Sequence, residues 1–245
     1  DEHKDLVLIK KGGNEAAIEL AEDQGIALFS ATGSCDMGKA LAPKVAKRLG
    51  RSLLELGGNN AAIVCKSADL DLTIKGITFS AAGTTGQRCT TLRRLFVHSE
   101  VHDIVLSKLK QSFSELKIGD PMDRNTQVGP LISEQSFKQM QEKLTACRSK
   151  GLTVTGGDRI DHATEVYVTP AIVETNEHID EMHEETFAPI LYVMPFTELK
   201  DAVNLQNSVK QGLSSSIFTN DVRESEFFLG PEGSDCGIAN VNIGT

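Results

Sequence analysis

Residues 26–56 read IALFSATGSCDMGKALAPKVAKRLGRSLLEL, and this stretch decides the fold class. Two short apolar runs, Ile26–Ser30 and Ser52–Leu56, predict buried strands. Between them, apolar residues recur four positions apart and predict an amphipathic helix over Asp36–Leu49, which Gly50 ends. A strand–helix–strand unit of this kind is typical of a doubly wound sheet with helices packed on it, so the sequence indicates an α/β fold.

The same alternation of strands and helices continues along the rest of the chain. Further strands are predicted over Leu6–Ile9, Ala61–Cys65, Leu95–His98, Leu152–Thr155, Val166–Val173, Ile190–Phe196, Ser214–Thr219 and Gly237–Ile243. Further helices are predicted over Asn14–Asp23, residues 69–82, Val101–Leu116, Ser133–Lys150, Glu198–Asn207 and Val222–Gly230. Neither an internal repeat nor a low-complexity segment interrupts this pattern, which is α/β throughout.

Composition excludes several classes of function. The formal net charge is −9, whereas a nucleic-acid surface needs clustered lysine and arginine, so no nucleic-acid partner is expected. The sequence contains no run of 18 apolar residues, so no membrane span is predicted. The five cysteines are odd in number and scattered, which predicts reduced thiols in a cytoplasmic compartment. The histidines are dispersed without a ligand pattern, so no metal site is expected.

Two short motifs carry the candidate chemistry. Gly86-Gln87-Arg88-Cys89 places a thiol beside an arginine in a glycine-bracketed turn, near a predicted loop-to-helix junction. A lone cysteine is most often a small buried apolar residue, but a thiolate beside a positive charge is a strong nucleophile. Glu55, in Glu55-Leu56-Gly57-Gly58, is either a solvent-facing strand end or a general base whose pKa is raised by partial burial. Together, a nucleophile and a hydrolytic base indicate acyl-enzyme chemistry.

These motifs resemble those of the aldehyde dehydrogenase superfamily. The resemblance includes Phe29–Ser34, similar to the turn that holds the cofactor phosphates, and Glu185–Ile190, similar to the nicotinamide-ribose motif. The four motifs follow one another in the family's order, so the resemblance covers nearly the whole chain. Leu54–Ala61, Gly86–Thr91 and Gln211–Thr219 also resemble the α-aminoadipic semialdehyde dehydrogenase, or antiquitin-like, branch.

The resemblance implies roles for individual residues. Cys89 is the implied nucleophile and Glu55 the implied base of an NAD-dependent oxidation of an aldehyde, such as an amino-acid-derived semialdehyde, through a thiohemiacetal and a thioester. The small-molecule aldehyde is the implied substrate and NAD the implied cofactor, although preference for NAD or NADP stays open. The residues implied to bind NAD are Gly33 and Ser34 at the pyrophosphate, Leu56 and Gly57 near the cofactor, Glu185 at the nicotinamide ribose and Phe187 at the ring side.

Arg88 has two interpretations. It either tunes the reactivity of Cys89 or pairs with an anionic substrate, since a planar guanidinium matches a carboxylate well. The antiquitin-like branch uses an arginine at this place to recognise the amino-acid end of its semialdehyde, which favours substrate binding.

The resemblance also implies that the chain is an internal fragment. Residues 1–57 correspond to the C-terminal portion of a Rossmann-like NAD-binding domain, and residues 58–245 to the α/β catalytic domain of the aldehyde dehydrogenase fold. The side-chain oxyanion amide and part of the NAD site are expected upstream, so the isolated chain is expected to bind NAD poorly and to turn over slowly or not at all. The full-length protein is expected to be a homo-oligomer, dimer or tetramer.

Two alternatives remain. Residues 33–39, Gly-Ser-Cys-Asp-Met-Gly-Lys, nearly match the phosphate loop of nucleoside triphosphatases, but Ala40 lacks the hydroxyl that would bind Mg²⁺. A catalytically incomplete fragment that retains only the fold is the second alternative.

Overall fold

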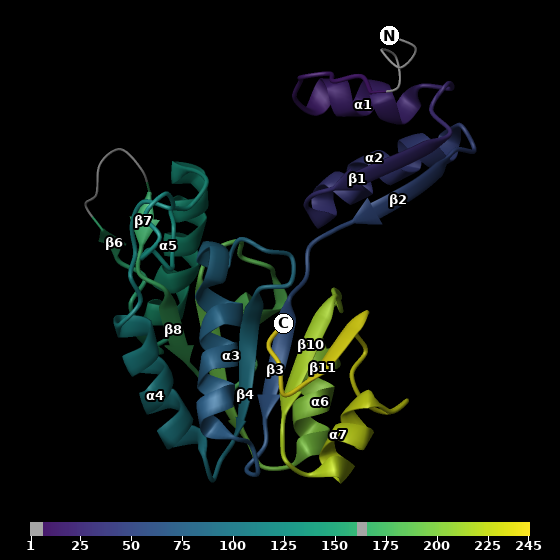
Figure 1. The fold of residues 1–245 in the computed structure, drawn as a ribbon. Coiled ribbons are helices and arrows are strands. Elements are labelled where there is room, and N and C mark those ends of the chain that lie inside the picture. The colour runs from purple at the N-terminus through teal and green to yellow at the C-terminus, as the bar shows by residue number, and fades with distance from the viewer. Residues whose placement is uncertain (1–6, 161–165) are drawn as a thin grey trace. The chain divides into compact units, whose positions relative to one another are not determined.

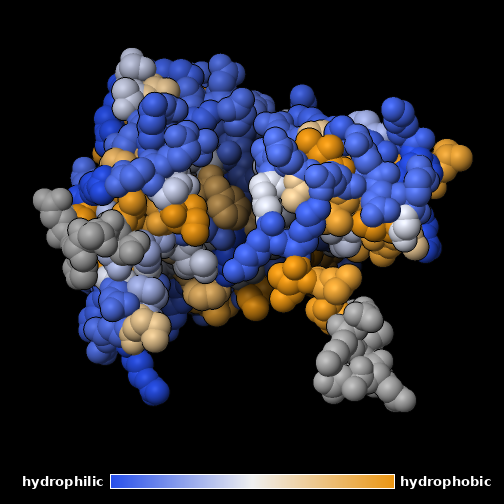
Figure 2. All heavy atoms as spheres, turned by 90° about the horizontal axis from the view of Figure 1, so that it is seen from above, coloured by the Kyte–Doolittle hydropathy of each residue, from blue (hydrophilic) through white to orange (hydrophobic). Residues whose placement is uncertain are grey.

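The computed structural model describes residues 7–160 and 166–245, and the chain forms two compact units, Asp1–Gly57 and Gly58–Thr245 (Figure 1). Most of the surface seen in Figure 2 is hydrophilic, with apolar residues scattered over it. None of the helices within these described ranges combines the length and the apolar character needed to cross a membrane.

The first unit contains the predicted strand–helix–strand segment. Strands β1 and β2 are parallel, with Leu28 opposite Arg51 and Thr32 opposite Glu55. Helix α2 packs on them through Leu41 and other buried apolar side chains. The elements in chain order are α1 (Asn14–Glu22), β1 (Leu28–Thr32), α2 (Cys35–Lys47) and β2 (Arg51–Glu55). The parallel pair and its crossover helix are those expected from residues 26–56.

The strand predicted over Leu6–Ile9 is wrong in its described part. Leu6 lies outside the described residues, and residues 7–9 form no secondary structure. Their side chains are exposed. A short apolar run becomes a strand only when a neighbouring strand hydrogen-bonds to it, and in the described part of this unit β1 and β2 pair with each other alone.

The second unit is built on one sheet. In its described part, seven strands lie in the order β11-β10-β3-β4-β9-β8-β5, and all neighbouring pairs are parallel except β5 with β8. The strands are β3 (Asn60–Val64), β4 (Leu92–His98), β5 (Thr153–Thr155), β8 (Ala171–Glu174), β9 (Ile190–Phe196), β10 (Ser214–Phe218) and β11 (Ile238–Val241). The α/β prediction is therefore confirmed.

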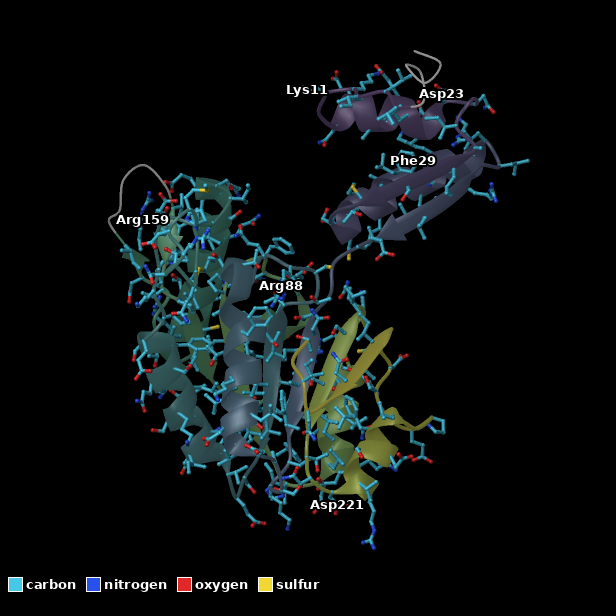
Figure 3. The ribbon with its side chains drawn as sticks, in the orientation of Figure 1. Lys11, Asp23, Phe29, Arg88, Arg159 and Asp221 are labelled. Carbon is cyan, nitrogen blue, oxygen red and sulfur yellow. The ribbon has the colours of Figure 1, made fainter. Side chains whose placement is uncertain are left out.

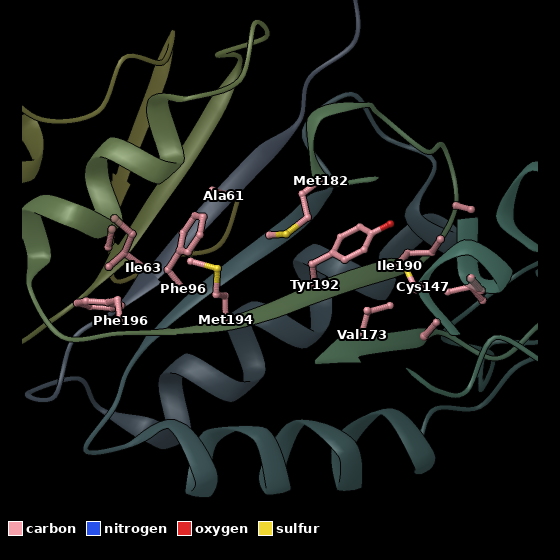
Figure 4. Close-up of a cluster of buried hydrophobic side chains, with 14 of the residues drawn as sticks. Ala61, Ile63, Phe96, Cys147, Val173, Met182, Ile190, Tyr192, Met194 and Phe196 are labelled. Atoms are coloured by element: carbon pink, nitrogen blue, oxygen red, sulfur yellow. The ribbon is translucent and has the colours of Figure 1, made fainter. Parts of the chain in front are cut away.

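Helices cover both faces of this sheet. The helices are α3 (Leu70–Ala82), α4 (His102–Ser114), α5 (Glu134–Ser149), α6 (Leu199–Asn207) and α7 (Val222–Leu229). Along β3, Ala61 and Ile63 enter a core shared with α5, α6 and α7, part of which Figure 4 shows. Ala62 and Val64 enter the opposite core, shared with α3 and α4. This alternation follows from the two-residue period of a strand.

One predicted strand is divided in two. Residues 166–173 were expected to be continuous, but the structure has β7 (Tyr167–Val168) and β8, separated at Thr169 and Pro170. Proline has no N–H to donate to a ladder, so the strand breaks there. The first half pairs instead with β6 (Arg159–Ile160), which the sequence pattern did not predict.

Candidate active site

Cys89 lies at the tip of a tight turn. The turn follows α3 and the short 3₁₀ helix η1 (Gly83–Gly86), and it leads directly into β4. The backbone N–H of Thr91 donates to the carbonyl oxygen of Arg88 across 3.0 Å, which closes the turn around Cys89. The predicted loop-to-helix junction is thus wrong: because a strand follows the cysteine, no helix N-terminus faces it from its own turn.

The backbone before Cys89 adopts an uncommon conformation. Thr84 and Thr85 have φ of 54°, and Gly86 follows with φ of 68°. A left-handed conformation costs a β-branched residue on the order of 1–3 kcal/mol, so it persists only where the surroundings enforce it. Here, the side chains of Thr85 and Gln87 both hydrogen-bond to the segment 129–132. The turn is therefore braced from outside.

Of the five cysteines, all of which are described, only Cys89 is exposed. Cys65 and Cys147 are buried, and burial raises the pKa of both thiols. Cys35 and Cys236 are half-buried. A thiol that is open to solvent on a braced turn is the one available to an external electrophile.

Asn60 holds the backbone of residues 86–91, the turn that carries Cys89 and is called the nucleophile turn below. The side chain is buried, and its Nδ2 donates to the carbonyl oxygens of Cys89 (2.7 Å) and Thr91 (2.9 Å). Its Oδ1 accepts from the N–H of Ser214 across 2.9 Å. The turn is thus tied to the first residue of β3 and, through it, to β10.

Two glycines allow three backbone segments to meet. A Cβ on Gly58 would lie 2.6 Å from the carbonyl oxygen of Cys89, and a Cβ on Gly86 would lie 2.4 Å from the carbonyl carbon of Ala188. The segments 58–60, 86–91 and 185–189 therefore converge at the amino-terminal ends of β3, β4 and β9. This is the edge opposite to the one that parallel α/β sheets most often use for ligands.

Glu185 lies on the third of these segments. Its carboxylate is largely buried, and Oε1 accepts from the N–H of Gly58 (3.4 Å) and from Nη2 of Arg93 (3.1 Å). The alternative prediction was a solvated acidic run. Glu184 is solvated in this way, but the Glu185 side chain is only 19% exposed and pairs with Arg93, so the alternative does not describe Glu185. In the described structure the hydrogen bonds to the carboxylate all use Oε1, which leaves Oε2 for a ligand.

Phe187 is 43% exposed, two residues after Glu185. The guanidinium of Arg93 lies 5.6 Å from the centre of its ring, on the protein side. The turn 186–188 is closed by a hydrogen bond from the N–H of Ala188 to the carbonyl oxygen of Thr186. An aromatic ring held in this way presents an apolar surface to a ligand at the same edge of the sheet.

Arg88 points to the end of α3 (Figure 3). Its Nη2 donates to the carbonyl oxygens of Phe79 (3.1 Å) and Ser80 (3.3 Å), and the guanidinium lies 4.8 Å from the centre of the Phe79 ring. Cations are favourable beside the carbonyl end of a helix, so this position is stable without a ligand. Both interpretations of Arg88 remain predictions.

In the first unit, Gly33 and Ser34 form the turn between β1 and α2. The N–H of Gly33 donates to the carbonyl oxygen of Glu55 (3.0 Å), and Oγ of Ser34 caps α2 by accepting from the N–H of Met37 (3.1 Å). The turn and the first residues of α2 present backbone N–H groups and the positive end of the helix dipole at the carboxyl end of β1. This is an arrangement suited to a phosphate group.

Glu55, Leu56 and Gly57 follow one another at the end of β2. Leu56 is half-buried and packs on α2, where a Cβ on Gly38 would lie 2.6 Å from Cδ1 of Leu56. Gly57 is the last residue of the first unit. Glu55 is exposed, so the partial burial expected for it is not seen, because its side chain leaves the end of a two-stranded sheet.

The model of the aldehyde dehydrogenase family matches residues 4–245. The chain belongs to the aldehyde dehydrogenase family. It is 47% identical to α-aminoadipic semialdehyde dehydrogenase of Rattus norvegicus over 236 residues, which are 96% of this chain and 44% of the relative.

Solved aldehyde dehydrogenase structures share the fold. Lactaldehyde dehydrogenase from Escherichia coli superposes with a TM-score of 0.88 at 31% identity, over 93% of this chain and 48% of that one. A structure of betaine aldehyde dehydrogenase from Staphylococcus aureus, described as in complex with NAD⁺, gives a TM-score of 0.90 at 23% identity, over 96% and 47% of the two chains. The chain spans less than half the length of these relatives.

Within this aldehyde dehydrogenase chain, sequence reasoning missed two residues that build the site. Asn60 was taken only as a turn signal, and Arg93 fell outside the strand predicted over Leu95–His98 and was given no role. A signal for Arg93 was available, since Leu92–His98 is an otherwise apolar strand with two arginines in it. A charge in a buried strand needs a partner, but its partner Glu185 is distant in the sequence.

Proposed function

We propose that this protein takes part in the oxidation of an aldehyde to a carboxylic acid, with Cys89 as nucleophile, Glu55 as the base for hydrolysis and NAD as hydride acceptor. One observation carries the proposal. Of the five cysteines, the one in the family's Gly-Gln-X-Cys motif is the one exposed on a braced turn.

The first step follows from the chemistry of a thiolate. The sulfur of Cys89 attacks the aldehyde carbon, a C–S bond forms, and the carbonyl oxygen becomes an oxyanion. The described hydrogen bonds give no acceptor to the N–H of Cys89, which suits it to stabilise that oxyanion. Loss of hydride from the same carbon then leaves a thioester on Cys89.

Taken unit by unit, the residues present suit separate parts of NAD, which supplies the hydride acceptor when bound. Gly33, Ser34 and the start of α2 would hold the pyrophosphate, and the backbone at Leu56 and Gly57 would adjoin the cofactor. The free Oε2 of Glu185 would accept from the hydroxyls of the nicotinamide ribose. Phe187 would pack against the ring side, using its exposed face.

Glu55 would complete the reaction. Its exposed carboxylate takes a proton from water, the hydroxide attacks the thioester carbon, and the C–S bond breaks. The carboxylic acid leaves and Cys89 is regenerated. The support for this role is the place of Glu55 in the Glu55-Leu56-Gly57-Gly58 motif, at the end of β2.

We propose an amino-acid-derived semialdehyde, such as α-aminoadipic semialdehyde, as the substrate. The support is the similarity to α-aminoadipic semialdehyde dehydrogenase and the presence of Arg88 beside the nucleophile. To meet the substrate carboxylate, the Arg88 guanidinium would exchange its two carbonyl acceptors on α3 for carboxylate oxygens. A homo-oligomer and a reducing, cytoplasmic compartment stay predictions for the full-length protein.

A single-turnover experiment tests the proposal. The chain is mixed with the semialdehyde and NAD, and NADH absorbance and the intact mass are followed together. With NAD in large excess, we expect a slow single-turnover burst of NADH for the native chain, at most one NADH per chain. We expect the same burst with a lasting thioester for Glu55→Gln, and neither product for Cys89→Ser.

Cys236→Ser is the matched control, because it removes a half-buried thiol outside the site. An equal burst from Cys89→Ser would overturn the assignment of the nucleophile. Absence of both burst and adduct from the native chain would favour the alternative, a fragment that keeps the fold without the activity.

A further inference from the structure

Arg93 is a buried cation whose contacts all lie in two loops. Its side chain extends from β4, and the residue is only 2% exposed. Toward the nucleophile turn, Nη2 donates to the carbonyl oxygens of Gly86 and Arg88, each across 3.3 Å. Toward the other loop, Nη1 donates to the carbonyl oxygen of Thr186 and Nη2 to Oε1 of Glu185. One guanidinium thus bridges segments 86–88 and 185–186.

The charges around Arg93 match this position. Burial lowers the pKa of its guanidinium, and the carboxylate of Glu185 opposes that effect by favouring the charged form. A buried charge is stable only when it is paired and hydrogen-bonded, and Arg93 is both.

The neighbouring arginine on the same strand has a different task. Arg94 points to the other face of the sheet, where it donates to the carbonyl oxygens of Asn59, Leu205 and Gln206. These contacts hold the end of α6 and do not include the nucleophile turn or the Glu185 loop. The bridging role therefore belongs to Arg93 and not to buried arginines of β4 in general.

We propose that Arg93 is a positioning residue. It fixes the nucleophile turn relative to residues 185–189, the Glu185 loop, so that Cys89 and the ribose-binding carboxylate keep a constant separation. Hydride transfer needs the aldehyde carbon on Cys89 and the nicotinamide ring to be held close together, and small displacements are costly. The inference deepens the proposed function and depends on it for the roles of Cys89 and Glu185.

The shape of the guanidinium is essential to this role. Arg93 spreads its two Nη nitrogens over both segments. Nη1 donates to the carbonyl oxygen of Thr186, and Nη2 donates to the carbonyl oxygen of Gly86 and to Oε1 of Glu185, so that Oε2 stays free. Lysine would keep the charge but has one compact nitrogen at the end of a flexible stem. Arg93→Lys therefore keeps the positive charge but removes the pair of Nη donors.

The test compares the native chain, Arg93→Lys and a destabilised control. Leu109→Ala is the control, because Leu109 is fully buried on α4 in the opposite core and touches neither loop. Amide hydrogen exchange is measured without ligand over residues 86–91 and 184–188. Binding of NAD and of ADP, which lacks the nicotinamide ribose, is measured by NMR titration.

In Arg93→Lys we expect exchange to become at least about tenfold faster in both segments, since hydrogen bonds to a charged group are lost in each. We also expect NAD affinity to fall by about tenfold while ADP affinity is unchanged, because only NAD reaches Glu185. Leu109→Ala should leave the ratio of NAD affinity to ADP affinity at the native value. This control therefore separates the effect of Arg93→Lys on the site from a general loss of stability.

The proposal is overturned if, in residues 86–91 or 184–188, hydrogen exchange is no faster in Arg93→Lys than in Leu109→Ala. It is also overturned if Arg93→Lys lowers the affinities for NAD and ADP together. A native chain that binds ADP but not NAD would instead defeat the proposed role of Glu185. In that case the exchange data alone still decide whether Arg93 fixes the two loops.

Discussion

Replacement of Gly86 by alanine is the sharpest test of how the candidate site is built. Gly86 has φ of 68°, and an added Cβ would lie 2.4 Å from the carbonyl carbon of Ala188 and 2.5 Å from the nitrogen of Pro189. These are backbone atoms and cannot rotate away. The Cβ would therefore push the nucleophile turn away from the loop that carries Glu185.

The magnitude has two parts that a control can separate. A left-handed conformation costs a residue with a Cβ about 1–2 kcal/mol. Inserting a methyl group into a packed contact costs about 1–3 kcal/mol more. Gly151→Ala has the first cost alone, because Gly151 has φ of 80° and a Cβ there would meet nothing within 4 Å. Alanine also restricts the unfolded chain, but this effect is equal in both variants.

The free energy of unfolding is measured by urea titration for the native chain and both variants, and iodoacetamide labelling of Cys89 is timed on the folded proteins. We expect Gly86→Ala to lose about 1–3 kcal/mol more than Gly151→Ala. We also expect it alone to change the labelling rate. If the two variants lose equal stability and label at the native rate, the two loops do not approach as described and the reasoning fails.

Three further predictions test other parts of the structure. Gly58→Ala should destabilise the chain by about 1–3 kcal/mol, because its Cβ would meet the carbonyl oxygen of Cys89; Gly119→Ala, where a Cβ makes only ordinary contacts, should be near neutral in the same titration. Asn60→Asp keeps the shape but removes both donors to the nucleophile turn, and it should lower the free energy of unfolding by about 2 kcal/mol or more; an unchanged value would contradict the brace. Burial, helped by two neighbouring side chains, lowers the pKa of His178 from its ordinary 6.5 to about 4, so the unfolded chain binds this proton first. Stability should therefore fall as the pH drops from 6.5 toward 4, by on the order of 2 kcal/mol after allowance for partial exposure, and His178→Asn should remove that portion of the pH dependence.

Much of the fold was predictable because it depends on local periodicity. The strand–helix–strand segment at residues 26–56 has apolar spacing that only one arrangement buries well, and the structure contains it. The break at Pro170 was also encoded, since proline cannot donate to a ladder, but the apolar run around it concealed the break. In its described part, residues 7–9, the strand predicted at Leu6–Ile9 is wrong, because a strand needs a hydrogen-bonded neighbour as well as apolar side chains.

The site was harder to predict because it depends on contacts between distant segments. Cys89 could be chosen by its motif, yet its turn leads into a strand, which the glycines around it did not reveal. The pairing of Arg93 with Glu185 joins residues that no local pattern connects. Arg88 stood beside the cysteine in the sequence, whereas its guanidinium contacts the end of α3.

The central claim is that Cys89 captures an aldehyde. The most direct test is a pulse of iodoacetamide on the folded chain, with and without the semialdehyde, followed by peptide mapping of all five cysteines. We predict that Cys89 is labelled first and that the aldehyde protects it alone, while Cys35 and Cys236 label slowly and without protection. Labelling of Cys89 that is no faster than that of the half-buried cysteines, or that the aldehyde leaves unchanged, would contradict the claim.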